Sequence, residues 1–208
     1  MLLIKDTETR FGVISILLHW YTAIVILFIL LPSGLLIYFI GPHGALRPLR
    51  ADLTFFHQSV ALTSIPFFLA RIVWRFGNGK PKTYRQHWVF SFSAELVWRL
   101  FLLLILVQIL TGPFFERLQW FGVDLFRLNV PEWLAPYEDY LPVAHLWAAY
   151  AIAGLLVFHI GGALRHYLIE RDRVLQGMLW PVVPDTPTPV EPSPAPARGD
   201  TAERGAGV

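Results

Sequence analysis

The most informative part of the sequence for the fold is YLPVAHLWAAYAIAGLLVFHIGGALRHYLI, residues 140–169. It has no Asp, Glu, Lys or Arg before Arg165, and roughly 20 apolar residues are enough for a helix to cross the ~30 Å hydrocarbon core of a bilayer. Two histidines, His145 and His159, interrupt its apolar run. Ionisable side chains within a membrane span are costly and usually face the interior of a helical bundle. The stretch therefore predicts a transmembrane helix that carries functional residues.

Three other blocks of the 208-residue chain have the same character, and they run from about residue 11 to 40, 53 to 76 and 89 to 115. The chain is 55% hydrophobic and only 15% charged, whereas soluble domains are near ~45–50% apolar and ~25% charged. The composition thus excludes an ordinary soluble domain. The first block is too long for a cleavable signal peptide, and no small-residue cleavage pattern follows it. We predict an all-α transmembrane four-helix bundle with up-down-up-down topology, occupying residues 1–179.

The distribution of basic residues predicts the orientation of this bundle, because cytoplasmic loops carry an excess of Lys and Arg. One side of the bundle carries ten of them: Lys5, Arg10, Arg71, Arg75, Lys80, Lys82, Arg85, Arg165, Arg171 and Arg173. The other side carries four: Arg47, Arg50, Arg117 and Arg127. We therefore expect both termini to lie in the cytoplasm.

Two segments outside the predicted helices have distinctive compositions. Residues 116–139 are rich in carboxylates, and we expect them to form an acidic cap outside the membrane. Residues 180–208 hold seven of the sixteen prolines and almost no bulky apolar side chain. Such a segment buries too little apolar surface to fold, so we predict a disordered cytoplasmic tail.

Four histidines lie at two matched depths in the predicted bundle. His19 lies eight residues inside the first helix, and His159 lies eight residues before Tyr167, where the fourth helix leaves the membrane on the same side. At 1.5 Å per residue, both are about 12 Å deep. On the opposite side, His57 and His145 lie five and six residues inside their helices. Each leaflet thus holds one pair of histidines.

The fourth helix can serve both levels. His145 and His159 are fourteen residues apart, which brings them to within about 40° of the same face and separates them by about 21 Å along the axis. A histidine of another helix, His57 or His19, completes each level. The sequence therefore predicts two stacked sites, each with two histidines.

Two histidines per level suit haem iron better than other chemistries. Zinc takes about four ligands, or three plus water, and a proton relay favours Asp or Glu in the membrane centre; the sequence offers neither. Haem iron takes two axial ligands, with imidazole a common choice. The absence of cysteine excludes iron–sulfur clusters and covalent c-type haem, and the only methionines, Met1 and Met178, are excluded as ligands. We predict two b-type haems (heme b) with bis-histidine ligation.

Other residues have several explanations. His166 is an alternative inner ligand to His159, or it hydrogen-bonds a haem propionate or a lipid phosphate. His43 and His87 are expected to be surface residues of loops. Four arginines have two equally good explanations: they contact haem propionates, or they anchor the helices at the membrane interface. These are Arg47, Arg50, Arg71 and Arg75.

Four motifs of the chain are typical of one known family: Leu18-His19-Trp20, Phe56-His57, Arg71-Ile-Val-Trp-Arg75 and His145-x13-His159-x6-His166-Tyr167. Through these motifs, the sequence resembles the bacterial cytochrome b561 family, which also includes the cytochrome b subunits of nickel–iron hydrogenases. The resemblance covers about residues 8–175.

The resemblance implies a four-helix bundle with two b haems, in which His19 pairs with His159 and His57 pairs with His145. It also implies electron transfer in the bacterial inner membrane between a quinone pool, such as ubiquinone, and a periplasmic donor or acceptor. Some family members oxidise superoxide and reduce ubiquinone, so a quinone-linked oxidoreductase of this superoxide oxidase type is one expectation. The expected partners are the lipid bilayer, a quinone and a redox protein, and no nucleic acid.

Two other classes of function stay open. A membrane-anchor subunit would pass electrons from a docked dehydrogenase or hydrogenase to quinone, with the acidic segment 116–139 as its docking surface. A haem-free transporter or structural bundle would use the histidines for protons or metal. Co-purification of a partner subunit identifies the first class, and a colourless purified protein identifies the second.

The predicted orientation can be tested with reporter fusions. Fusions after Lys82 and Gly177 should report the cytoplasm, and fusions after Pro48 and Pro131 should report the periplasm, because the basic loops stay inside. A cytoplasmic signal at Pro131 would invert the compartment that each pair of histidines faces.

Overall fold

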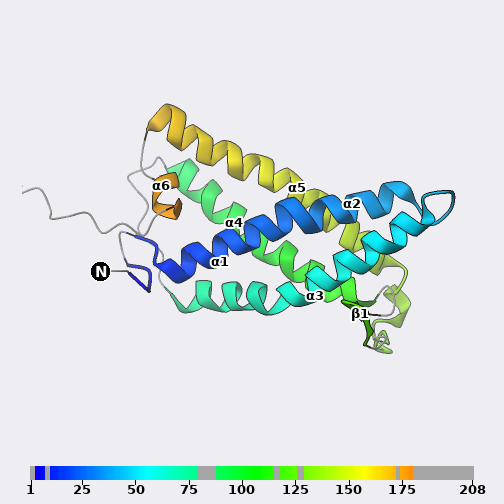
Figure 1. The fold of residues 1–208 in the computed structure, drawn as a ribbon. Helices are drawn as coiled ribbons and strands as arrows, with labels where there is room; N and C mark the ends of the chain where they lie inside the picture. The colour runs from blue at the N-terminus through cyan, green and yellow to red at the C-terminus, as the bar shows by residue number, and fades with distance from the viewer. Residues whose placement is uncertain are drawn as a thin grey trace, which may run out of the picture.

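The computed structural model describes residues 3–7, 10–78, 88–114, 118–125, 129–171 and 174–179. Within these residues, four helical stretches are long and apolar enough to cross a membrane: Val13–Ile40, Arg47–Gly77, Glu95–Phe114 and Tyr140–Glu170. They run side by side and alternate in direction (Figure 1). The prediction of an all-α, up-down-up-down four-helix bundle is confirmed.

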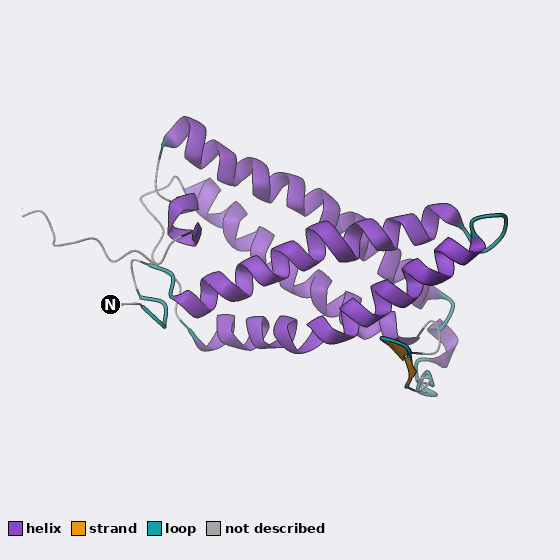
Figure 2. Ribbon diagram, viewed as in Figure 1, coloured by secondary structure: helices purple, strands orange, loops and turns teal. Residues whose placement is uncertain are grey.

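The secondary structure of the described residues is almost entirely helical, as Figure 2 shows. The first span consists of α1 (Val13–Ile24), the π-helical η1 (Val25–Leu30) and α2 (Leu31–Ile40). The second and third spans are α3 (Arg47–Gly77) and α4 (Trp88–Thr111), the latter followed by the 3₁₀ turn η2 (Gly112–Phe114). The fourth span is α5 (Tyr140–Arg165) with the π-helical η4 (His166–Glu170). The shorter elements are β1 (Gln119–Trp120), β2 (Val123–Asp124), η3 (Ala135–Tyr137) and α6 (Val174–Leu179).

The second span begins earlier than its apolar run. The sequence predicts a start near residue 53, whereas α3 begins at Arg47. Pro48 lies in the first turn, where its fixed φ suits a helix and its missing N–H costs no hydrogen bond. The residues from Arg47 to Leu53 therefore extend the helix at its N-terminal end, before the apolar segment begins.

A short antiparallel hairpin, β1 and β2, lies against α3 (Figure 1). The Trp120 indole Nε1–H donates to Thr63 Oγ1 at 3.0 Å, and the Phe121 N–H donates to Ser59 Oγ at 3.0 Å. Gly122 has a φ of +88°, a conformation that favours glycine and allows the tight turn. Part of the segment predicted as an acidic cap is thus packed along the side of the second span.

Several sequence predictions fall on residues outside the described ranges. These are the Pro-rich tail, residues 180–208, and the loop of residues 79–87 with its basic residues and His87. The described basic residues do segregate: Lys5, Arg75 and Arg171 belong to one end of the bundle, and Arg47 and Arg50 to the other. Membrane orientation and the disordered tail stay predictions.

The helices pack as two hairpins. The first span lies along α3, α4 lies along α5, and contact between the two hairpins is sparse. Between the two predicted histidine levels, Val25, Phe68 and Ile105 form a buried apolar cluster that joins the first three spans. We refer to these three residues as the central cluster.

Replacing Phe68 with alanine should lower the stability of the bundle. Phe68 is 5% exposed within the central cluster, and truncating a buried Phe costs about 3–5 kcal/mol. Phe76→Ala is the matched control, because Phe76 belongs to the same helix and is 74% exposed. Thermal denaturation of the purified variants measures the difference, and equal losses for both would contradict the assignment of Phe68 to the core.

Candidate functional site

His19 and His159 face each other across the interior of the bundle. Their ring centroids are 6.0 Å apart and the rings are inclined by 58°, although the two residues belong to the first and last spans. Two imidazoles that bind one metal ion through bonds of about 2 Å each have their ring centres at about this separation. Phe101 of α4 packs edge-on against His159 at 5.7 Å. His19 and His159 would therefore be able to hold one metal ion between them.

Arg71 of α3 lies against the His19 ring. Its Nη2 hydrogen-bonds His19 Nδ1 at 3.0 Å, and its Nη1 donates to the Leu18 carbonyl at 3.2 Å. A guanidinium only donates hydrogen bonds, so Nδ1 of His19 is the acceptor and a neutral ring carries its proton on Nε2. A neutral His19 ring would therefore bind a metal ion through Nε2 only if Arg71 released Nδ1.

His57 and His145 form the second level. Each lies next to a hydroxyl of a neighbouring helix: His57 Nδ1 is 2.8 Å from Ser33 Oγ of α2, and His145 Nδ1 is 3.0 Å from Thr111 Oγ1 of α4. Within the described residues, no group of three or more His, Cys, Asp or Glu could hold a metal ion, so each level offers a pair of ligands.

Glycines let these two rings approach their neighbouring helices closely. A Cβ added at Gly34 would be 3.2 Å from His57 Cε1, and one added at Gly112 would be 3.1 Å from His145 Cε1. Both distances are tighter than ordinary contacts. The hydroxyl and the glycine are adjacent in each case, as Ser33-Gly34 and as Thr111-Gly112.

These four residues were not predicted from the sequence. The available signal was a hydroxyl–glycine dipeptide placed toward the same end of two different spans. That signal has no meaning until the histidines opposite it are known, because serine and glycine are common in membrane helices for packing reasons.

The remaining predicted residues lie elsewhere. The Arg75 guanidinium stacks over the Trp98 ring, 4.9 Å from its centroid. His166 Nδ1 lies 2.5 Å from a carboxylate oxygen of Glu170 in the terminal π turn, and Arg165 pairs with the same carboxylate at 2.8 Å. The structure thus gives His166 a partner in its own turn, and His159 is the residue that faces His19.

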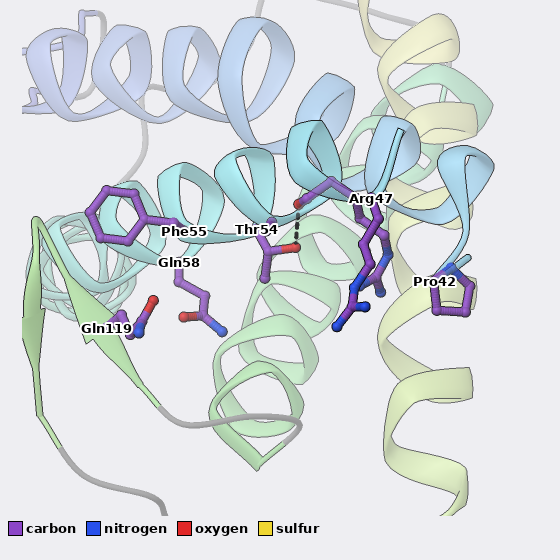
Figure 3. Close-up of a pocket in the computed structure, with 8 residues that line it drawn as sticks. Pro42, Arg47, Thr54, Phe55, Gln58 and Gln119 are labelled. Carbon is purple, nitrogen blue, oxygen red and sulfur yellow. Dashed lines mark hydrogen bonds between the residues drawn. The ribbon is translucent and has the colours of Figure 1, made fainter. Parts of the chain in front are cut away.

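A cavity of about 310 Å³ opens at the end of the bundle near His57 (Figure 3). It is lined by both basic and neutral residues: Pro42, Arg47, Arg50, Ala51, Thr54, Phe55, Gln58 and Gln119. The Nε atom of Arg50 is buried and makes no hydrogen bond to the described residues. Arg50 precedes His57 by two helical turns, about 10 Å. The cavity therefore offers cationic donors to an anionic group beside the second level.

Substitution of Gly112 should disturb the His145 ring. Gly112→Ala places a methyl group 3.1 Å from Cε1, and overpacking of this kind costs about 1–3 kcal/mol. Gly161→Ala is the control, because a Cβ there meets nothing within 4 Å and alanine raises helix propensity by up to ~1 kcal/mol. Melting temperatures should fall for Gly112→Ala and stay level or rise for Gly161→Ala; the reverse order would exclude a close approach at Gly112.

Comparison with known proteins identifies the family of the chain. A family model described as prokaryotic cytochrome b561 matches residues 10–181. Cytochrome b561 homolog 2 of Escherichia coli (strain K12) is 26% identical over 179 residues, which is 84% of this chain and 93% of that protein. The resemblance found in the sequence motifs is confirmed. With its four membrane-crossing helices, the chain belongs to the prokaryotic cytochrome b561 family of membrane haem b electron-transfer proteins.

Proposed function

We propose that the chain holds two b haems, one at each histidine level, and transfers electrons across the bacterial inner membrane. The observation that carries this proposal is the 6.0 Å separation of the His19 and His159 rings. Ligands from the first and last spans can bind one iron from opposite faces, and imidazole is a common axial ligand of haem iron. We call the level of His19 and His159, on the predicted cytoplasmic side, the inner level and that of His57 and His145 the outer level. His57 and His145 are proposed as the ligands of the outer haem.

The two levels are separated along the membrane normal. His145 and His159 are fourteen residues apart on α5, which corresponds to about 21 Å. One level therefore lies toward each surface, and electrons can enter at one side and leave at the other. When bound, the haems supply the one-electron chemistry, while the protein supplies ligands, burial and charge.

Arg71 is proposed to change partners when the inner haem binds. Its hydrogen bond to His19 Nδ1 must break before Nε2 of His19 can bind iron in a neutral ring. The released guanidinium is then available for a haem propionate, with which it would form a charge-assisted hydrogen bond. Arg75, stacked on Trp98, is the weaker candidate for that contact.

Arg47 and Arg50 are proposed to serve the outer haem in the same way. They line the cavity near His57, and the unsatisfied Nε of Arg50 would gain a partner from a propionate. A buried donor without an acceptor costs about 1–3 kcal/mol. A carboxylate in this cavity would remove that cost.

The redox partners belong to the same proposal. We infer exchange of electrons between a quinone pool, with ubiquinone as the candidate, and a donor or acceptor in the periplasm, with superoxide as a candidate donor. Family membership supports electron transfer in general. Rapid oxidation of a reduced quinone or of superoxide by the purified protein would identify the substrate.

Haem content and paired histidine variants test the proposal. The pyridine haemochrome assay should give two haems per chain, neither of them covalent. His57→Ala and His145→Ala should each remove mainly the outer haem, and His19→Ala and His159→Ala mainly the inner one, because each iron loses one of its two ligands.

His43→Ala is the control, since His43 lies exposed in the loop between α2 and α3. Members of a pair should resemble each other in their absorption spectra more than they resemble the other pair. A match between His19→Ala and His57→Ala would overturn the pairing. Loss of a haem in His166→Ala but not in His159→Ala would reassign the inner ligand.

A further inference from the structure

Two hydroxyl–glycine dipeptides hold the two outer histidines in the same way. Ser33 Oγ lies 2.8 Å from His57 Nδ1 and Thr111 Oγ1 lies 3.0 Å from His145 Nδ1, while the glycine that follows each hydroxyl packs against Cε1 of the ring. Both hydroxyl residues are buried, at 6% and 8% exposure. The same hydroxyl–glycine arrangement thus occurs twice, on two different helices, at one level of the bundle.

The protons of these hydroxyls are already used. Ser33 Oγ donates to the Ile29 carbonyl at 2.6 Å, and Thr111 Oγ1 donates to the Val107 carbonyl at 2.6 Å. A hydroxyl has one proton to donate and lone pairs to accept with. In its contact with histidine each hydroxyl is therefore the acceptor, and Nδ1–H of the ring is the donor.

This assignment determines the tautomer of both rings. With the proton on Nδ1, a neutral imidazole has its free lone pair on Nε2, which is the form that can bind a metal ion through Nε2.

The inner level has the opposite arrangement at His19. There Nδ1 accepts a hydrogen bond from Arg71 at 3.0 Å, so the neutral ring carries its proton on Nε2. The outer histidines are consequently ready for metal binding through Nε2 as they stand, whereas His19 requires a change of hydrogen-bond partner.

We propose that Ser33 and Thr111 are positioning residues of the outer haem: they hold His57 and His145 with Nε2 free and, by accepting the Nδ1–H bond, make both imidazoles stronger electron donors to iron. The inference rests on the proposed binding of a haem at this level. A stronger donor stabilises ferric over ferrous iron, as expected when an outer-shell acceptor raises the basicity of a ligating histidine. The two hydroxyls therefore lower the midpoint potential of the outer haem.

Thr111→Val tests this inference in the full-length protein. Valine keeps the shape of threonine and removes the acceptor, so the ratio of ferrous to ferric outer haem at a fixed potential should rise about tenfold, which is 59 mV for a one-electron couple. Redox titration of the haem absorption measures this shift, and the outer haem is the component lost in His145→Ala. Ser33→Ala should shift the same component in the same direction.

Two variants serve as controls. Thr22→Val removes a buried hydroxyl that donates to the Leu18 carbonyl at 2.7 Å, the same bond to its own helix that Thr111 makes, and it should leave the outer potential unchanged. Thr111→Ser keeps the acceptor with a smaller side chain and should restore the wild-type potential. Loss of the outer haem in Thr111→Val together with its retention in Thr111→Ser also supports the inference.

Three results would count against these assignments, and they are distinguishable. An outer potential in Thr111→Val equal to that in Thr22→Val overturns the inference, while two haems per chain leave the proposed function standing. Loss of the outer haem in both Thr111→Val and Thr111→Ser shows that the acceptor, which serine keeps, is not sufficient to hold His145 for haem binding, and it overturns the inference too. Fewer than two haems in the wild-type protein refute the proposed function itself.

Discussion

The cost of an unpaired polar side chain inside hydrocarbon governs how these helices pack. Each of the four spans is mostly apolar, so lipid is as good a neighbour as another helix for most of its surface. The histidines are different, because their ring nitrogens need partners where no water is available. His57, His145 and His19 find those partners on other helices, in Ser33, Thr111 and Arg71. These contacts determine which faces of the spans turn inward.

Sparse packing between the two helical hairpins follows from the same arrangement. The central cluster closes the middle of the bundle with apolar side chains, and histidines lie above and below it. Each histidine level is thus bordered by rings from both hairpins. A cofactor held at each level would add contacts between the two hairpins, which pack only sparsely against each other.

The two levels use one scaffold but differ in chemistry. Backbone-bonded hydroxyls accept from Nδ1 at His57 and His145, whereas a cation donates to Nδ1 at His19. Because outer-shell partners tune a ligated metal through the basicity of its ligands, this difference gives the two levels unequal electronic surroundings. An electron carrier with two centres benefits from unequal potentials, since the inequality sets a preferred direction of transfer.

The four spans, their alternation and the histidine pair of α5 were predictable from the sequence, because apolar length and helical periodicity are local properties of the chain. It also indicated the family, through motifs around His19 and His57. The contacts between helices became visible only in the folded chain: Arg71 with His19, the hydroxyl–glycine dipeptides with the outer histidines, and the hairpin with Ser59. Even within the first span, the π-helical η1 lies between His19 and Ser33. Its wider turn changes the relative direction of the two side chains, so side-chain directions along the span could not be extrapolated from a regular helix. Contacts between helices depend on rotation and depth together, and no local pattern specifies both.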